Sequence, residues 1–384
     1  MTAVSGGLRF VLRSTPVNLR ELRRRWLSGG ALGELRYRPL ELDLAGSRRL
    51  LRELPVDDVA DAGLAGLLRE KRDELERKLT MLGELGSPRY REGSLQLYGG
   101  VDAATLAAAE ALLAAAPRDP AAPGAGAVSA ARLQALARAE IAHYRAQDPS
   151  FAAEVELRAD LGAGAVCSNG RLLLNAHPTT PAHRVEALLQ HEVGVHLVTF
   201  YNGLAQPLGV FARGLAGCVE LQEGLAVVAE LLAGGLDGPR LRVLAGRIVA
   251  VRALLDGAAL GETIGLLAET HGFPRETAFD VACRVHRGGG LTKDVVYLRG
   301  LLAVLRYLGE GGDLAPLLVG KVALRHVPVV QGLLERGALR PPRFRPRVSE
   351  TPQGAATWAR LRRGVDLAAL VRLASAGGEG RSAG

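Results

Sequence analysis

The sequence feature that most constrains this chain is a pair of histidines five positions apart, with a glutamate directly after the first. The segment reads HEVGVH over residues 191–196. In the familiar His-Glu-x-x-His pattern, both histidines bind zinc from one helix face, and the glutamate is the general base toward water. This chain has one more residue between its histidines than that pattern has.

The extra residue predicts a local change of helix type. At about 100° per residue, positions i and i+4 lie roughly 40° apart around a regular helix, whereas i and i+5 lie roughly 140° apart. A regular helix would therefore not direct His191 and His196 toward one ion. A π-bulge absorbs one residue and returns both rings to one side, and such bulges concentrate at functional sites. Gly194, between the histidines, makes this distortion easier.

A later segment supplies a third candidate ligand. Glu223 lies 27 residues after His196, in a largely apolar run over 219–233 that has helical periodicity and is followed by two glycines. A carboxylate amid so much apolar sequence is costly to bury unless it is paired or bound to a metal. We therefore predict a zinc site made of His191, His196 and Glu223.

Two neighbours of Glu223 bear on this prediction. Glu220 lies one turn earlier on about the same face, so it is the alternative third ligand, or else a hydrogen-bond acceptor for an imidazole N–H. Gly224 is a poor helix former, and one use for it is to let another backbone approach closely. A further alternative is that Glu223 caps a helix or pairs with an arginine.

These segments resemble a known family. From about residue 185 to 343 the chain resembles the bacterial proteins named for a QEGLA motif and described as flavohemoglobin expression-modulating. Those proteins are similar in turn to the eukaryotic microtubule-associated tyrosine carboxypeptidases. The matching pieces are HEVGVH at 191–196, YNGLAQPL at 201–208, LQEGLA at 221–226, CRVHRGG at 283–289, LTKDVVYLRG at 291–300 and VGK at 319–321. Earlier pieces, STPVNL at 14–19, LRYRPL at 35–40 and SLQLYG at 94–99, extend the resemblance over most of the chain.

The resemblance implies roles for four residues. In the carboxypeptidases, two histidines and the later glutamate hold zinc, and the glutamate after the first histidine activates water. By resemblance, His191, His196 and Glu223 would hold Zn²⁺, and Glu192 would be the catalytic base. A peptide or protein C-terminus would be the substrate, without tyrosine being implied as the residue removed.

The sequence after the ligands offers a substrate clamp. Arg284 and Arg287 share a face of a predicted helix, and three glycines then turn the chain into a second helix that carries Lys293 and Tyr297. Tyr297 suits the donor that a developing oxyanion needs, and Arg287 or Lys293 suits the terminal carboxylate of a substrate. The alternative is that Arg284, Lys293 and Asp294 form an internal ion-pair network.

Composition agrees with a globular enzyme without pointing to one, with 384 residues, 48% hydrophobic and 23% charged. The net charge of +8 admits an anionic partner, yet the arginines are spread along the chain, so nucleic-acid binding is not expected. The start lacks the apolar core of a signal peptide, and no apolar run of about 18 residues predicts a membrane span, so we expect a cytoplasmic location. Three cysteines without paired spacing favour small buried residues over disulfides or a cysteine zinc site.

The chain is predicted to have an α+β, mostly helical fold of the zincin-like metallopeptidase type. Residues 1–116 are expected to form an N-terminal α/β region, with β-like segments at 8–12 and 35–44 and a helix over 62–82. A flexible linker over 117–130 precedes the catalytic domain at 131–345. That domain should contain a β-hairpin around Ser168-Asn169-Gly170, whose edge strand is suited to hold a peptide. Residues 346–384 are expected to form a basic C-terminal region with one helix over 357–374 and a disordered tail.

The sequence as a whole predicts a zinc-dependent metallopeptidase, most simply a carboxypeptidase. Two other classes stay open: a regulatory or binding protein with a structural zinc site, and a metal hydrolase acting on an amide that is not a peptide. Asn202 and Gln206 follow the predicted helix that carries the two histidines. They are expected either to line the substrate cleft or to form hydrogen bonds with the backbone of a loop. We favour the backbone role for Asn202.

Overall fold

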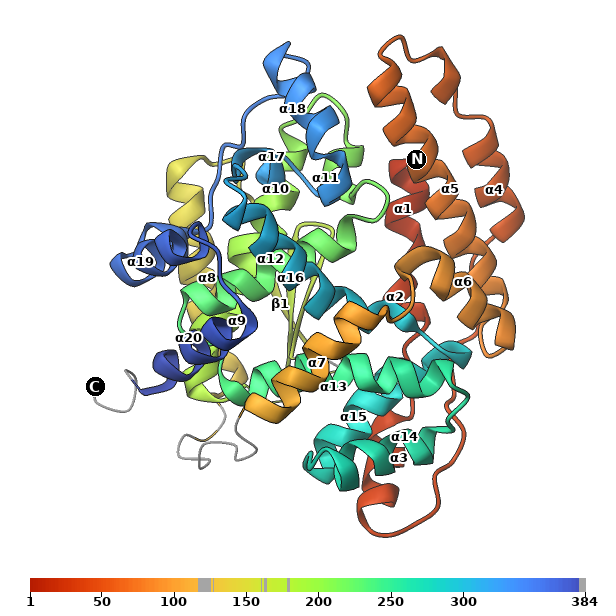
Figure 1. The fold of residues 1–384 in the computed structure, drawn as a ribbon. Helices are drawn as coiled ribbons and strands as arrows, with labels where there is room; N and C mark the ends of the chain where they lie inside the picture. Colours follow the sequence, from red (N-terminus) through yellow and green to blue (C-terminus); the bar gives the residue numbers. More distant parts are fainter. Residues whose placement is uncertain (117–125, 127, 160, 162–163, 178–179, 380–384) are drawn as a thin grey trace. The chain divides into compact units, whose positions relative to one another are not determined.

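Helices make up most of the described structure, and one small sheet accompanies them (Figure 1). The computed structural model describes residues 1–116, 126, 128–159, 161, 164–177 and 180–379. The α+β, mostly helical class predicted from the sequence is confirmed at this level. Most of the predicted linker at 117–130, and the end of the predicted tail at 380–384, lie outside the described residues.

The chain divides into two compact units, and each contains two separate stretches of sequence. The first unit is Met1–Arg118 with Leu241–Leu298, and the second is Asp119–Arg240 with Arg299–Gly384. The predicted division into an N-terminal region at 1–116, a catalytic domain at 131–345 and a C-terminal region at 346–384 stays a prediction.

The described part of the first unit is helical. Its elements are α1 (Thr2–Leu8), α2 (Phe10–Arg13), α3 (Leu19–Leu27), α4 (Leu44–Arg52), η1 (Val56–Asp58), α5 (Ala62–Gly83), α6 (Pro88–Tyr98), α7 (Ala103–Ala115), α14 (Leu260–Gly265), η4 (Leu266–Thr270), α15 (Arg275–His286), η5 (Arg287–Gly289) and η6 (Thr292–Asp294). Two of the three unit boundaries fall inside helices: 240/241 in α13 (Gly238–Leu255) and 298/299 in α16 (Val295–Gly309). The predicted long helix is α5, which packs against α4 (Figure 1). Asp61 caps its N-terminus by accepting a hydrogen bond from the amide of Leu64.

The strands predicted in the N-terminal region are wrong. Residues 8–12 belong to two short helices that break at Arg9, where φ is 41°, and both Leu8 and Phe10 are buried beside this break. The alternation of apolar residues therefore reflects a helix break rather than a pleated strand. Residues 31–43 have no regular secondary structure. The carbonyl of Arg36 accepts from the amide of Val17, and the amide of Arg36 donates to the side-chain oxygen of Asn18, so these two bonds do not form a strand ladder.

The described helices include no single one that is both long and apolar enough to cross a membrane. Only α6 and α7 taken together reach that length and composition, and they are bent by 92° relative to each other.

The second unit contains the sheet and the helices around it. Its elements are α8 (Ala130–Gln147), β1 (Glu154–Arg158), β2 (Ala165–Ser168), β3 (Arg171–Asn175), η2 (Ala182–Arg184), α9 (Val185–Leu189), η3 (Gln190–Leu197), α10 (Val198–Leu204), α11 (Val210–Arg213), α12 (Cys218–Leu232), α17 (Ala315–Leu318), η7 (Leu324–His326), α18 (Val327–Glu335), η8 (Arg347–Glu350), α19 (Pro352–Leu361) and α20 (Leu367–Glu379).

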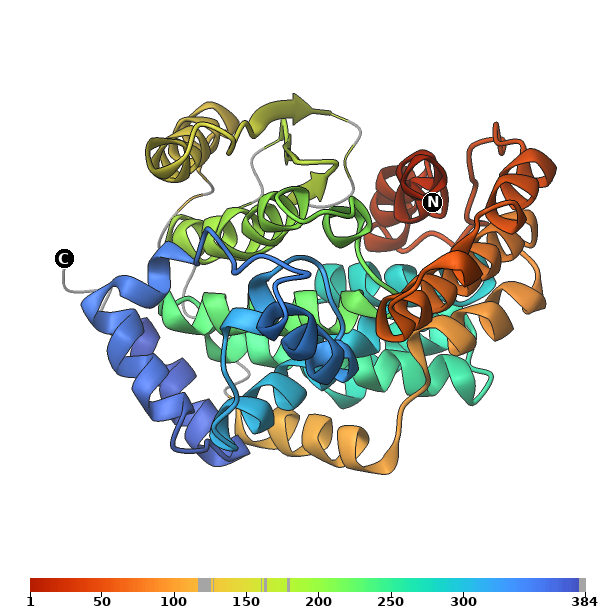
Figure 2. The ribbon, with the colours of Figure 1, turned by 90° about the horizontal axis from the view of Figure 1, so that it is seen from above.

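The predicted hairpin is present as β2 and β3, which pair antiparallel with Ser168 opposite Arg171. Asn169 and Gly170 form the two-residue turn, and both have positive φ, 51° and 79°, as a type I′ turn requires. The first strand, β1, pairs parallel to β3, so the strand order is β1-β3-β2. The sheet packs on η3, and Figure 2 shows the strands beside the light green helical segment that contains η3 and α10.

One buried cluster joins the sheet, α8 and the η3–α10 helix into the core of the second unit. Phe151 stacks on Tyr144 and lies tilted against Tyr201, and Phe344 from the C-terminal stretch packs edge-on against it. Leu172 and Leu174 of β3 are fully buried in the same cluster. This core fixes the histidine-bearing helix from one side.

The single helix predicted over 357–374 is wrong, because the chain forms two helices there, α19 and α20. Gly364 has φ 84°, in the left-handed region that favours glycine and stops a helix. Asp366 then caps the next helix by accepting a hydrogen bond from the amide of Ala369 at 2.7 Å. The apolar periodicity continues across the break, which explains why the sequence pattern suggests one helix.

Candidate metal centre

The segment that carries the two histidines is a π-helix. Residues Gln190–Leu197 form η3, which continues directly from α9 and runs on into α10 without a break in backbone direction. In a π-helix the hydrogen bonds run from i to i+5, so side chains five positions apart are neighbours on one face. The change of helix type predicted from the extra residue is therefore confirmed, and it extends over eight residues rather than a single bulge.

Gly194 is required inside this π-helix by a close neighbour. A Cβ at this position would lie 2.6 Å from Oε1 of Gln190, one helical turn earlier. Gln190 is fully buried, and its amide nitrogen donates to Glu140 at 2.8 Å and to Glu186 at 3.1 Å. Because these two carboxylates hold the Gln190 side chain, it has little freedom to yield to a larger residue at 194.

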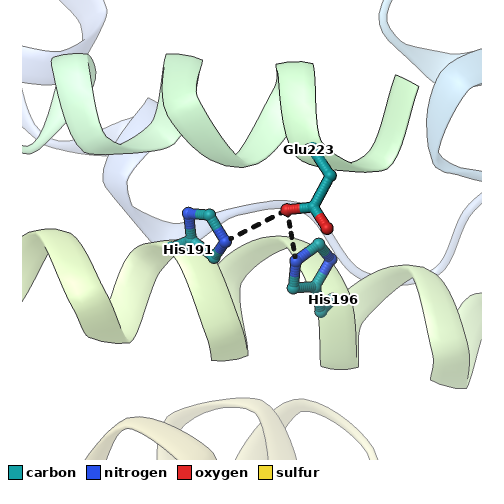
Figure 3. Close-up of side chains that lie close together, drawn as sticks. All are labelled: His191, His196 and Glu223. Atoms are coloured by element: carbon teal, nitrogen blue, oxygen red, sulfur yellow. Dashed lines mark ion pairs between the residues drawn. The ribbon is translucent and has the colours of Figure 1, made fainter. Parts of the chain in front are cut away.

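His191 and His196 of η3 and Glu223 of α12 converge on one point. Figure 3 shows both imidazoles and the carboxylate directed toward one another from the two adjacent helices. Glu223 Oε2 lies 3.6 Å from Nε2 of His191 and 3.7 Å from Nε2 of His196. One ligand atom from each of the three residues lies within 4.8 Å of the others. His191 and Glu223 are buried, with 8% and 9% of their surfaces exposed.

These distances fit a zinc ion better than direct hydrogen bonds. Nitrogen and oxygen ligands about 2.0–2.1 Å from a tetrahedral zinc lie about 3.3–3.4 Å from one another. The two nitrogen-to-oxygen distances of 3.6 and 3.7 Å are near that separation and longer than a hydrogen bond. Two imidazoles and one carboxylate are also a ligand set typical of catalytic zinc, which leaves a fourth position open.

Glu192 lies in the π-helix directly after His191, and its carboxylate has an unused oxygen. Glu192 is 8% exposed, and its Oε2 atom is buried without a hydrogen-bond partner among the described residues. Buried polar atoms are normally paired, so an orphaned carboxylate oxygen indicates a place for water or another ligand. This is the property expected of a group that takes a proton from water.

Glu230 is a member of the site that the sequence analysis missed. Nδ1 of His191 donates a hydrogen bond to Oε1 of Glu230 at 2.9 Å. Glu230 lies on α12, two turns after Glu223, and only 2% of it is exposed. A carboxylate that accepts from the far nitrogen of a histidine ligand fixes the tautomer and aims the other nitrogen at the metal. Its signal in the sequence was the same as that of Glu223: a charged residue inside an apolar helix.

Two arginines hold Glu230 in its ionised form. Arg184 donates to Oε2 at 2.6 Å, and Arg240 donates to both carboxylate oxygens at 2.9 and 3.0 Å. Burial alone would raise the pKa of Glu230, but these two guanidinium groups outweigh it and hold the pKa well below its ordinary value. Burial would likewise lower the pKa of His191, whereas its contacts with Glu223 and Glu230 raise that pKa to about 10.

Glu220 does not take either of the roles considered for it. Its Oε2 accepts hydrogen bonds from Nε and Nη2 of Arg299 at 2.9 and 2.5 Å. The acceptor for the imidazole N–H is Glu230 instead.

Gly224, by contrast, has the role predicted for it. A Cβ on Gly224 would lie 2.4 Å from the carbonyl of Gly300, so the backbones of α12 and α16 approach closely there.

Asn202 and Gln206 form hydrogen bonds with backbone groups. The sequence analysis favoured this role for Asn202. The amide nitrogen of Asn202 donates to the carbonyls of Leu318 and Phe344 at 2.8 and 2.9 Å, and its oxygen accepts from the amide of Phe344 at 2.9 Å. Gln206 likewise donates to Val319 at 3.1 Å. Both side chains therefore anchor the C-terminal stretch to the end of the histidine-bearing helix.

The three cysteines are free thiols. Cys218 and Cys283 are buried, and burial raises the pKa of Cys283 to about 12, so its thiol is protonated at neutral pH. Cys167 on β2 donates through Sγ to the backbone oxygen of Glu192 at 3.2 Å. This contact ties the sheet to the π-helix. The cluster of candidate ligands found among the described residues contains no cysteine.

The predicted substrate-binding residues belong to the first unit, whereas the histidines and Glu223 belong to the second. Arg284 donates to both oxygens of Asp294 at 2.7 and 2.8 Å, which is the ion pair of the internal-network alternative. Lys293 lies over the ring of Tyr297, with its nitrogen 5.0 Å from the ring centre. Arg287 is buried and contacts none of these side chains by a hydrogen bond.

Comparison with known proteins places the chain in a family. A search of curated proteins finds no match to this sequence. A family profile, described as microtubule-associated tyrosine carboxypeptidase, matches residues 29–366. The match covers most of both units and includes the π-helix, α12 and the Arg284–Tyr297 segment. The chain therefore belongs to the microtubule-associated tyrosine carboxypeptidase family.

Proposed function

We propose that this protein is a zinc-dependent metallopeptidase, a carboxypeptidase that hydrolyses the C-terminal peptide bond of a peptide or protein. Membership of the family supports a carboxypeptidase-type activity. The observation that carries the metal-dependent part is the convergence of His191, His196 and Glu223 within 4.8 Å. The proposal takes only the reaction type from the family and leaves the residue removed, and any microtubule partner, outside its scope.

His191, His196 and Glu223 would hold the zinc ion, with His191 oriented by Glu230. When bound, zinc would supply a Lewis acid that polarises the scissile carbonyl and makes water more acidic. Glu192 then takes the proton of the attacking water with its unpaired carboxylate oxygen and passes it to the nitrogen of the departing amino acid. Tyr297 is the proposed donor to the oxyanion, a role that rests on its residue type.

The proposal assigns the substrate carboxylate to the cations of the Arg284–Tyr297 segment. Arg284, Arg287 and Lys293 were predicted for this purpose. Because Arg284 already donates to both oxygens of Asp294, its guanidinium has a partner within the protein. The binding role falls more naturally on Arg287 and Lys293.

The test is the substitution Glu192→Gln, which removes the base but keeps the size and most of the shape of the side chain. We expect the variant to retain zinc and to lose hydrolysis by about 10²–10⁴-fold, the usual contribution of general base catalysis. Elemental analysis measures the first quantity, and cleavage of a peptide library with free C-termini measures the second. Full activity in this variant would remove Glu192 from the mechanism.

The same library separates the proposed reaction from the other classes considered. A carboxypeptidase requires the free terminal carboxylate, so we expect amidated copies of the cleaved peptides to resist hydrolysis. Equal cleavage of both forms would point to a metal hydrolase that is indifferent to the C-terminus. Absence of cleavage of any peptide by zinc-loaded protein would favour a binding protein with a structural zinc site.

A further inference from the structure

Arg347 joins the C-terminal stretch to the segment that carries the histidines, and both belong to the second unit. Its Nε donates to the two carboxylate oxygens of Glu140 at 3.1 and 2.9 Å, and its Nη2 donates to Glu186 at 2.9 Å. These two carboxylates also accept from the side chain of Gln190. Four side chains thus form one hydrogen-bonded network that reaches from η8 to the π-helix.

The network depends on the positive charge of Arg347. Glu140 and Glu186 each offer one oxygen to the single side-chain nitrogen of Gln190, so the two carboxylates lie close together. Ionised carboxylates so placed repel each other, and Glu140 is 5% exposed, so water screens it little. The guanidinium of Arg347 donates to both groups and balances this repulsion. Without it, the two acceptors of Gln190 would move apart or take up a proton.

Gln190 carries the effect of this network to the candidate metal centre. It is the first residue of the π-helix and is fully buried, and its amide nitrogen is fixed by the two carboxylates. Its Oε1 faces Gly194, where an added Cβ would lie only 2.6 Å away. His191 follows Gln190 directly, and Gly194 lies between the two histidines. The position of the Gln190 side chain therefore bears on the turn that brings both histidines to one face.

The backbone at Arg347 is itself held in place. Its amide donates to the hydroxyl of Tyr144 at 2.8 Å, and Tyr144 is fully buried in the core of the second unit. Phe344, three residues earlier, packs edge-on against the same ring. The short helix η8, which begins at Arg347, packs against both η3 and α12. The guanidinium thus extends from a fixed point, as a support for a precise site requires.

We propose that Arg347 is a positioning residue for the candidate metal centre. Through the two carboxylates and Gln190, it holds the π-helix in the form that directs both histidines to one point. The C-terminal stretch is then part of the metal centre although it contributes no ligand. The identity of the ion as zinc rests on the proposed function, whereas the support of the π-helix rests on the network alone.

Zinc affinity of the full chain, measured by competition with a chelator, tests the proposal. Arg347→Gln should weaken zinc binding by about tenfold, the lower end of the effect of losing an outer partner of a metal ligand. Arg347→Lys should weaken it less, because it returns the charge without the fork that reaches two carboxylates. The matched control is Arg343→Gln, which should leave the affinity unchanged. Arg343 comes from the same stretch but pairs with Asp148.

A second substitution tests whether Arg347 acts through Gln190. Gln190→Met keeps the length of the side chain but cannot donate to the two carboxylates, so by itself it should weaken zinc binding. Adding Arg347→Gln to Gln190→Met should then cost little more, because the connection between them is already broken. Losses that multiply in the double variant would show that Arg347 acts on the fold in general, and would overturn the proposal.

Hydrogen exchange of the π-helix amides in the metal-free protein separates this proposal from the proposed function. In Arg347→Gln we expect the amides of residues 190–197 to exchange about tenfold faster than in the wild type, since local opening becomes easier. In Arg343→Gln they should exchange at the wild-type rate. If the wild type holds no zinc while this exchange depends on Arg347, the support of the π-helix stands and the proposed function falls.

The opposite result is equally clear. If the wild type holds zinc, but Arg347→Gln changes neither the zinc affinity nor the exchange rate, the proposal is overturned and the proposed function stands. If Arg347→Gln does not fold, as thermal unfolding would reveal, Arg347→Lys takes its place. Wild-type affinity and wild-type exchange in Arg347→Lys would then overturn the proposal.

Discussion

Among single residues, Glu230 supports the candidate metal centre through its hydrogen bond with His191. Because a carboxylate can only accept, the hydrogen bond at 2.9 Å places a proton of His191 on Nδ1. Nε2 of the same ring then faces Glu223 and His196. Arg184 and Arg240 keep Glu230 ionised, so the orientation persists in the absence of a metal.

The substitution Glu230→Gln should weaken zinc binding by about 10–100-fold, the usual effect of removing the hydrogen-bond partner of a histidine ligand. The amide would no longer balance Arg184 and Arg240, and it would compete poorly for the Nδ1 proton. Competition with a chelator of known affinity measures the change. Glu220→Gln on the same helix is the matched control, because Glu220 pairs with Arg299 rather than with a histidine. Equal zinc affinity in both variants would refute this role of Glu230.

Asp294 should make stability depend on pH in the acid range. Burial would raise its pKa, but Arg284 and Arg247 outweigh burial and hold the pKa well below the ordinary value of 3.8. A carboxyl group whose pKa is lowered by folding adds to the free energy of unfolding. This contribution is fully present above pH 3.8 and declines as the pH falls from there toward the folded-state pKa. Asp294→Asn should therefore cost about 3 kcal/mol at neutral pH, with the difference from wild type narrowing below about pH 4.

Chemical denaturation at pH 7, pH 5 and pH 3 tests the Asp294 prediction. The control is Asp256→Asn, since Asp256 is more than half exposed and pairs with Arg252 within one helix. This surface pair should change the free energy of unfolding by at most about 0.5 kcal/mol. A cost of Asp294→Asn that does not vary with pH would show that the ion pair is not its source.

At this scale the sequence predicts which three side chains come together better than it predicts the groups that hold them. The convergence of His191, His196 and Glu223 is predictable because their spacing and apolar context leave few other uses for them. Glu230 has the same apolar context, but nothing in the sequence links it to one ring nitrogen of His191. Its partners Arg184 and Arg240 come from separate segments, and only the folded chain brings them to one carboxylate.

Among the elements, the pair formed by η3 and α12 creates the site. The extra residue between the histidines is accommodated by a π-helix, which needs Gly194 because Gln190 occupies the neighbouring space. The second helix, α12, is fixed by a close backbone crossing with α16 at Gly224 and Gly300. Each glycine in this pair permits an approach that a side chain would block.

Gly224→Ala should destabilise the protein by about 1–3 kcal/mol, the usual cost of forcing extra volume into a packed core. The added Cβ would lie 2.4 Å from the backbone carbonyl of Gly300, which cannot move without shifting α16. The matched control is Gly66→Ala in α5, where nothing lies within 4 Å of the added atom. That change should stabilise by up to about 1 kcal/mol through helix propensity. Thermal unfolding of both variants gives the comparison, and two stabilising outcomes would contradict the close crossing.

Elements with a strong periodic pattern of apolar residues are predicted well. Elements whose bounds depend on an interruption of a helix are not. The helix over 62–82, the helix α12 that ends just before Gly234 and the hairpin turn at Asn169-Gly170 all follow from local residues. The N-terminal segment at 8–12 has the alternation of a strand but folds as two helices, because Arg9 takes a left-handed conformation. Such a conformation depends on the packing of Leu8 and Phe10, which the pattern alone does not contain.

For the whole molecule, the main feature is that each compact unit draws on two stretches of the chain. Residues 241–298 pack with residues 1–118, and residues 299–384 pack with residues 119–240. Sequence analysis divides a chain in serial order, because composition and turns mark boundaries but not partners. The candidate zinc ligands nevertheless all come from the second unit, so the metal centre is built within one unit.

The central claim is that His191, His196 and Glu223 hold a zinc ion, and metal content tests it most directly. Elemental analysis of the purified full chain should give about one zinc per molecule, and the double variant His191→Ala/Glu223→Ala should give none while remaining folded. A well-folded wild type that holds no zinc, even after supplementation, would contradict the claim and the proposed function with it.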